Sequence, residues 1–156
     1  MATFDPEKTT VKTRHALAHA QAMARELGHP ELTSLHLLMA TVQQEGGLVR
    51  PLLERAGVHG AAVERAISKA FSLLPRIDGG DLRPSKELGH ALDAATTEAL
   101  QLRDRFLSTE HLLLALVSDA AERHRVKASE VLRTLGATRE LLLSALSEVR
   151  GAQHAD

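Results

Sequence analysis

The sequence predicts an all-α domain of eight helices, and three observations lead to this prediction. Leu and Ala supply most of the apolar volume, whereas aromatic residues are only 2% of the 156 residues. Both are strong helix formers, and the β-branched residues that favour strands are few. Apolar residues also recur at spacings of three and four, which is typical of amphipathic helices. Finally, the first half of the chain is repeated in the second.

The repeat is visible when the sequence is laid on itself at an offset of 75 residues. Residues 10–42 then align with residues 85–117 without a gap, and twelve of the 33 aligned positions are identical. The identities include two pairs of histidines, His15 with His90 and His36 with His111. Past a loop that is four residues longer in the second copy, the offset becomes 79. We therefore expect each copy to contain the same four helices.

Cap residues and glycines set the expected helix bounds. Thr10 is a probable N-cap of the first helix and Gly28 can end it, while Thr33 and Ser34 cap the second helix, which stops at Gly46 and Gly47. In the first copy the helices are expected over about 10–27, 34–45, 49–56 and 61–71. In the second copy they are expected over about 85–102, 108–118, 128–135 and 138–149.

The segment between the copies contains two prolines and a pair of glycines, which disfavour a continuous helix. We therefore divide the chain into an amino-terminal extension (1–9), a first repeat (10–71), a linker (72–84), a second repeat (85–149) and a terminal segment (150–156). Each repeat has only about 60 residues and would be marginally stable alone. The repeats should therefore pack into one pseudo-symmetric domain, and a groove between their matching faces is the first place to look for a ligand.

Composition argues against several classes of function. The chain has 19 basic and 20 acidic residues, a net charge of −1, and only three Phe as aromatic residues, so it lacks the features of a nucleic-acid binder. No apolar run approaches the roughly 20 residues of a membrane span, and the amino terminus does not resemble a signal peptide. A cytoplasmic protein that contacts neither nucleic acid nor membrane is expected.

No catalytic motif is recognisable. The phosphate-binding GxxxxGK[ST] pattern, GxSxG and HExxH are not found, and the chain has no cysteine, so neither ATP hydrolysis nor a catalytic residue is predicted. His15 and His19 are spaced to share a metal on one helix face, but no third ligand is evident and Ala94 replaces His19 in the second copy. We predict no metal site. A small metal-dependent enzyme that uses the histidines is the more distant alternative, and stoichiometric zinc in the purified protein would support it.

Polar residues at the starts of the second and sixth helices are ambiguous. His36 and His111 lie in equivalent first turns, where we interpret each imidazole as bonding near the cap or packing between helices. Glu110 follows the preference of a helix start for acids, although the first copy has Leu35 there. Asp104 aligns with His29. Two acids in only one copy break the symmetry, and both a structural and a functional interpretation stay open.

Several longer segments resemble a known family. The stretches 12–21, 28–38 and 107–115 resemble the duplicated Clp amino-terminal domain of AAA+ unfoldases. The stretches 44–57, 74–77, 80–85 and 147–151 look most like those of its disaggregating branch, ClpB. The similarity extends from about Lys8 to Gly151.

The resemblance implies a chaperone function in the stress response. Such a domain is the mobile amino-terminal part of a hexameric threading machine, where it engages exposed hydrophobic segments of unfolded or aggregated proteins and helps deliver them to the central pore. The ATPase modules of the same protein, which use ATP and magnesium, would follow residues 150–156, and the machine would cooperate with a DnaK-type chaperone. No cofactor is implied for this chain itself.

The family's functional residues map onto Thr10, Asp104 and Glu110, beside an apolar groove at Leu88 and Leu92. We expect the leucines to hold the client and the two acids to orient the groove wall or to attract positive charge. The chain departs from the family pattern in its second-copy loop, residues 119–127, which lacks the glycine of the first copy. The alternative function is an adaptor-docking domain like those of the protease-associated relatives ClpA and ClpC.

Overall fold

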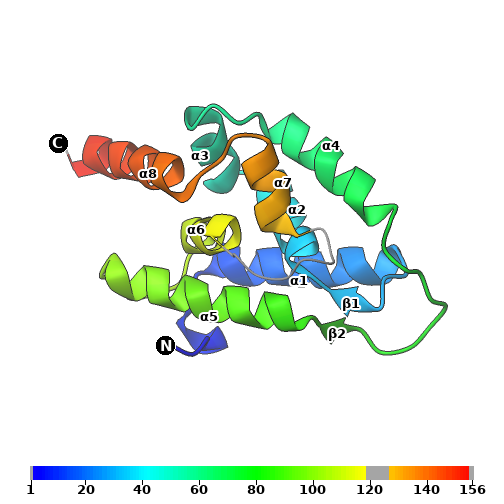
Figure 1. The fold of residues 1–156 in the computed structure, drawn as a ribbon. Helices are drawn as coiled ribbons and strands as arrows, with labels where there is room; N and C mark the ends of the chain where they lie inside the picture. The colour runs from blue at the N-terminus through cyan, green and yellow to red at the C-terminus, as the bar shows by residue number, and fades with distance from the viewer. Residues whose placement is uncertain (1, 119–126, 155–156) are drawn as a thin grey trace.

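The computed structural model describes residues 2–118 and 127–154, and eight α-helices lie in these ranges (Figure 1). The helices are α1 (Val11–Glu26), α2 (Ser34–Gln43), α3 (Val49–Arg55), α4 (Gly60–Phe71), α5 (Lys86–Gln101), α6 (Thr109–Ser118), α7 (Ala128–Thr134) and α8 (Arg139–His154). The predicted all-α fold is confirmed. Residues 119–126 of the longer second-copy loop lie outside the described ranges.

Helix α8 differs most from its predicted bounds. The sequence suggested an end near Val149, but the helix continues to His154, through residues that were expected to begin a linker. Arg150 precedes Gly151 there, and it is tied to α6 and to the turn between α5 and α6 by ion pairs described below. A side-chain anchor of this kind offsets the low helix propensity of a single glycine.

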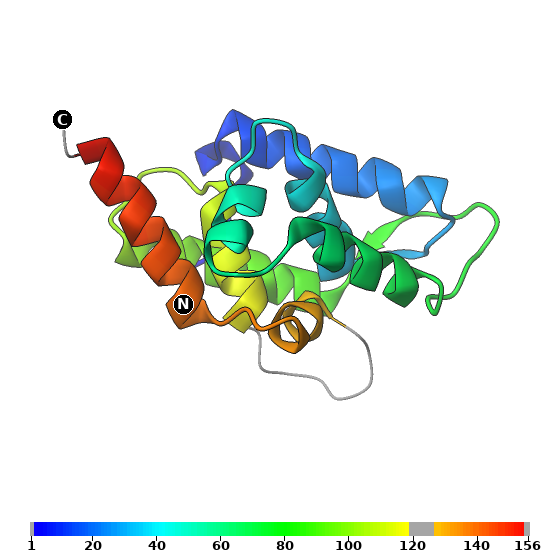
Figure 2. The same cartoon turned by 90° about the horizontal axis from the view of Figure 1, so that it is seen from above.

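The helices form three layers with α2 and α6 in the middle (Figures 1 and 2). Helices α1 and α5 cover one side of this pair, and α3, α4, α7 and α8 cover the other. Residues 34–42 of α2 are all buried, as are residues 109–117 of α6 except the partly exposed Glu110, and these two ranges are equivalent at the offset of 75. A helix that is buried on every side explains why their sequences are apolar almost throughout.

Two very short parallel pairings join the copies, and the sequence did not predict them. Strand β1 (Glu31–Leu32), just before α2, pairs with β2 (Arg83–Pro84), just before α5. An equivalent bridge joins Thr9, before α1, to Leu107, before α6. At the offset of 75, Thr9 corresponds to Pro84 and Leu32 to Leu107, so the two pairings are exchanged by the pseudo-twofold symmetry.

The backbone hydrogen bonds of these pairings are also equivalent. The Ser85 N–H donates to the Leu32 carbonyl at 2.9 Å, and the Thr10 N–H donates to the Leu107 carbonyl at 3.0 Å. In each copy, the segment before the first helix thus pairs with the segment that precedes the second helix of the other copy. The interface is completed by packing of α3 on α8, α4 on α7 and α2 on α6.

Candidate functional site

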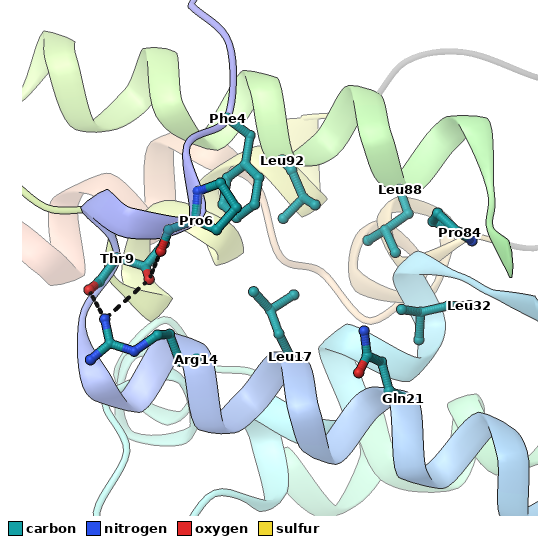
Figure 3. A pocket seen from close by; sticks show the side chains of 10 residues that line it. All are labelled: Phe4, Pro6, Thr9, Arg14, Leu17, Gln21, Leu32, Pro84, Leu88 and Leu92. Carbon is teal, nitrogen blue, oxygen red and sulfur yellow. Dashed lines mark hydrogen bonds between the residues drawn. The ribbon is translucent and has the colours of Figure 1, made fainter. Parts of the chain in front are cut away.

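A pocket of about 290 Å³ lies between α1 and α5, at the junction of the two copies (Figure 3). Helix α1 contributes residues to one side, α5 to the other, and the amino-terminal segment closes one end. Its lining consists of Phe4, Pro6, Thr9, Arg14, Leu17, Gln21, Leu32, Pro84, Leu88 and Leu92. The lining is mostly apolar, with polar groups from Arg14, Gln21 and Thr9 at its edges.

The pocket has a buried floor and half-buried walls. Leu88 is only 1% exposed and Leu32 only 5%, so both belong to the core beneath the pocket. Leu17 and Leu92 are half-buried, and Leu17 points from α1 toward Leu92 on α5. These two leucines are equivalent at the offset of 75, which places the pocket between matching faces of the copies, where the sequence suggested a groove. Leu92 is therefore accessible to a ligand, whereas Leu88 mainly supports the floor.

The segment that precedes α1 runs along the mouth of the pocket. The Phe4 ring lies beside Leu92, and the Phe4 N–H donates to Asp93 Oδ1 at 2.9 Å (Figure 3). Closer to α1, the Arg14 guanidinium donates to the Thr9 carbonyl at 2.6 Å. Phe4, Leu17 and Arg14 line the pocket but were not predicted from the sequence. The alignment of Leu17 with Leu92 was the available signal for one of them.

Thr10 has a structural contact that explains its identity. Its hydroxyl oxygen accepts the Thr13 N–H at 3.2 Å, so it caps α1 as predicted. The Thr13 hydroxyl in turn donates to the Leu107 carbonyl of the other copy at 3.1 Å. Thr10 adjoins Thr9 at the pocket but does not itself line it. It acts on the pocket by fixing the start of α1.

Asp104 and Glu110 do not line this pocket. Both carboxylates face Arg150 of α8, which donates to Asp104 Oδ2 at 2.7 Å and to Glu110 Oε2 at 3.4 Å. Asp104 Oδ2 also accepts from His111 Nε2 at 2.7 Å. The described contacts of the two acids therefore join α8 to the turn between α5 and α6. Sequence could not pair residues that are 40 and 46 positions apart.

The charges of this cluster stabilise one another. Burial alone would raise the pKa of Asp104, but hydrogen bonds from Arg150 and His111, together with the positive charge of Arg150, lower it overall. Burial acts to lower the pKa of Arg150, but the hydrogen bond and charge of Asp104, and then those of Glu110, raise it. Since Arg150 already compensates the carboxylates, they are poorly suited to attract a cation from a ligand.

Asp104 and His29 occupy equivalent positions and play the same role, since each contacts the capping histidine of its own copy. In each copy a backbone N–H donates to Nδ1 of the histidine, from Thr33 to His36 at 3.0 Å and from Ser108 to His111 at 2.9 Å. Each neutral ring then has its proton on Nε2 and needs an acceptor there. His36 Nε2 lies 2.8 Å from His29 Nδ1, whereas His111 uses Asp104. The interpretation of these histidines as cap residues is confirmed.

The first-copy histidine pair is buried against an aromatic ring. His36 is 0% exposed and stacks on Phe71 with ring centroids 4.8 Å apart. Burial, and then the neighbouring His29, lower the pKa of His36 to about 4. Burial and the charge of Arg76 lower the pKa of His29, against a hydrogen bond to the Phe71 backbone that raises it. A neutral pair in the first copy thus replaces the charged cluster of the second.

Within residues 2–118 and 127–154, no three side chains of the metal-ligating types gather in one place. His15 and His19 are both exposed on α1. None of the described helices has the length and apolar character needed to cross a membrane.

The fold and the pocket define a helical double-repeat domain with an apolar groove between its copies. The family model for the "Clp repeat (R) N-terminal domain" matches residues 8–135. The chain belongs to this Clp N-terminal domain family.

Named relatives identify the branch of the family. The chaperone protein ClpB of Rhodopirellula baltica is 37% identical over 150 residues, which is 96% of this chain but only 16% of the relative. The Hsp104 N-terminal domain from Candida albicans has a TM-score of 0.77 at 22% identity, over 96% of this chain and 95% of that one. A ClpV N-domain in complex with a VipB peptide has a TM-score of 0.71 at 24% identity, over 89% of each chain. This chain is therefore a ClpB-like N-terminal domain of an AAA+ chaperone.

Proposed function

We propose that this chain is the substrate-binding domain of a ClpB-like disaggregase. It engages exposed hydrophobic segments of unfolded or aggregated proteins and passes them to an ATP-driven pore. The observation that carries the proposal is the apolar pocket between α1 and α5, open at Leu17 and Leu92. The hexamer, the ATP- and magnesium-using modules, a cytoplasmic location and cooperation with a DnaK-type chaperone belong to the whole machine in this proposal.

The size of the pocket suits a transient complex. A volume of about 290 Å³ accommodates one or two apolar side chains, at the small end of ligand pockets in proteins. A disordered client loses conformational freedom when it binds, and a small apolar contact offsets that loss only in part. The complex should be weak, as a delivery step requires, because the client must leave for the pore.

The proposed site residues take different roles within this picture. Leu92 contacts the client, and Leu88 supports the pocket floor beneath it. Thr10 fixes the start of α1 and with it the position of the neighbouring Thr9. Asp104 and Glu110 act at a distance, because through Arg150 they hold α8 against the turn between α5 and α6.

The proposal is tested by adding a permanently unfolded protein to wild type and to two charge variants on α5. Leu92→Glu places a carboxylate in the wall of the pocket, whereas Leu100→Glu changes an exposed leucine of the same helix outside the pocket. We expect at least about a tenfold loss of affinity for Leu92→Glu, because desolvating a charge against an apolar client is costly. Leu100→Glu should bind as wild type does. Equal binding by all three proteins, or methyl chemical shifts that change only away from Leu17 and Leu92, would contradict the proposal.

A second candidate is an adaptor-docking domain. It is kept because the fold is shared with ClpV N-domains, one of them in complex with a VipB peptide, and with the N-terminal domain of ClpD from Arabidopsis thaliana. The same pair of variants separates the two functions. Binding of a folded partner that survives Leu92→Glu would favour adaptor docking, whereas loss of unfolded-protein binding favours the disaggregase function.

A further inference from the structure

The amino-terminal segment already places an aromatic side chain at the pocket. Phe4 is half-buried and, like Leu17 and Leu92, packs against the apolar cluster that contains Leu32 and Leu88. Its backbone N–H donates to Asp93, one residue beyond Leu92 on α5. The backbone next to an aromatic ring and the ring itself are thus both recognised by neighbouring residues of one helix (Figure 3).

The two ends of this segment are held very differently. At its base, Thr9 is 3% exposed, is paired with Leu107, and its hydroxyl donates to the Pro6 carbonyl at 2.8 Å. At its tip, within described residues 2–4, the hydrogen bond that fixes the chain is the one from Phe4 to Asp93. The tip can therefore leave the pocket without disturbing the base, since few contacts must break.

The place beside α5 where Phe4 is held, which we call its seat, exists on only one side of the pseudo-twofold axis. The position equivalent to Asp93 in α1 is Ala18, which has no acceptor, and the position equivalent to Phe4 is Gly79, which has no side chain. Repeat symmetry alone therefore does not require this pair of residues. This pair makes the pocket asymmetric, because the carboxylate that accepts a backbone N–H lies on the α5 side only.

We infer that Phe4 occupies the seat of a client residue, and that the amino-terminal segment competes with clients for the pocket. This inference rests on the proposed function and names its preferred ligand. The ligand is an extended segment with one aromatic or large aliphatic side chain, whose own backbone N–H replaces that of Phe4 at Asp93. A client that left this half-buried carboxylate without a donor would bind less well.

Competition of this kind lowers the apparent affinity in a calculable way. When a fraction of the molecules has the seat open, the apparent dissociation constant is the intrinsic one divided by that fraction. If the seat is open in about one molecule in ten, removing the Phe4 ring tightens client binding about tenfold. A wall residue that simply contacts the client would give the opposite result, because its removal weakens binding.

The test uses the whole chain and a peptide probe. The probe is a twelve-residue Gly/Ser peptide with a central Leu-Trp-Leu run, and its fluorescence is unambiguous because the chain has no Trp or Tyr. We expect Phe4→Ala to bind it about three- to tenfold more tightly than wild type. The matched control is Phe106→Ala, which removes a 49% exposed ring outside the pocket and should leave affinity unchanged. Adding Asp93→Ala to Phe4→Ala should weaken binding, because the peptide loses its acceptor.

Amide spectra supply a second readout. In wild type the peptide should move the Phe4 amide signal, because displacement breaks the hydrogen bond from the Phe4 N–H to Asp93. Binding by Phe4→Ala that equals or falls below wild-type binding, while Leu92→Glu still abolishes it, overturns the competition and leaves the proposed function intact. Probe binding that is insensitive to Leu92→Glu overturns both. Far-UV circular dichroism confirms that each variant is folded.

Discussion

Acid should destabilise this domain through the buried histidine pair of the first copy. The perturbation is His36→Gln, because glutamine in the third position of a helix can still accept the N–H of the cap residue Thr33 but does not titrate. The pKa of His36 is about 4 in the folded protein, whereas an imidazole in an unfolded chain has a pKa near 6.5. As pH falls, the unfolded state therefore binds the proton first, and stability that is fully present above pH 6.5 is lost toward pH 4.

The size of the effect follows from these two values. Between pH 7 and pH 5, the difference in proton binding lowers the free energy of unfolding by about 2 kcal/mol for this one group. His29 contributes in the same direction, since its pKa is also lowered, and it remains in the variant. The variant should therefore lose about 2 kcal/mol less than wild type over this range, and its pH dependence should diminish without vanishing.

Urea unfolding at pH 7, 6 and 5 measures this difference. The chain has no Trp or Tyr, so far-UV circular dichroism is the appropriate signal. Each protein is compared with itself across pH, which removes the cost of the lost His36 contact with Phe71. His90→Gln on the exposed side of α5 is the control for the number of histidines. If His36→Gln and wild type lose the same free energy between pH 7 and pH 5, the burial argument is wrong.

Two further predictions concern stability at neutral pH, and both are read from denaturant midpoints. Arg103 has a φ of 60°, in the same left-handed region as the equivalent Gly28 of the first copy, which has a φ of 72°. Arg103→Gly should therefore raise the free energy of unfolding by about 0.5–1 kcal/mol, and Gly28→Ala should lower it by about 1 kcal/mol. A loss of stability in Arg103→Gly would refute the backbone strain at this position. Glu98 is 7% exposed and accepts two hydrogen bonds from Arg139, so Arg139→Met should cost about 2 kcal/mol. The double variant with Glu98→Met should recover part of that loss, and no recovery would mean that the ion pair is not the cause.

Helix positions could be predicted from sequence because their causes are local. The period of apolar residues and the caps at Thr10 and Thr33 act within one turn, and these two caps form as expected for α1 and α2. The two-residue pairing of β1 with β2 and the single bridge between Thr9 and Leu107 have no such signal. Their partners are about 50 and 98 positions apart, and a strand of two residues is too short to show alternation.

The candidate site was predictable only in part, for the same reason. The family resemblance pointed to Leu88 and Leu92, but sequence cannot tell which of them forms the floor of the pocket and which forms its wall. The acids were noticed because they break the repeat, yet their partner Arg150 comes from α8, 46 and 40 positions later. Phe4 was assigned to an amino-terminal extension, since nothing in residues 1–9 indicates what the segment covers.

Comparison of the two copies separates what the fold needs from what the site needs. Features retained in both copies, such as the capping histidines and the exchanged pairings before α1 and α5, hold the helices in place. Divergence at His29 and Asp104 is compensated, because each still accepts the Nε2 proton of a capping histidine. The difference between Ala18 and Asp93 does not preserve a shared contact in this way, because Asp93 accepts a hydrogen bond from the Phe4 N–H instead. A difference that packing does not require, located at the mouth of an apolar pocket, is what selection for an oriented ligand would leave in a duplicated domain.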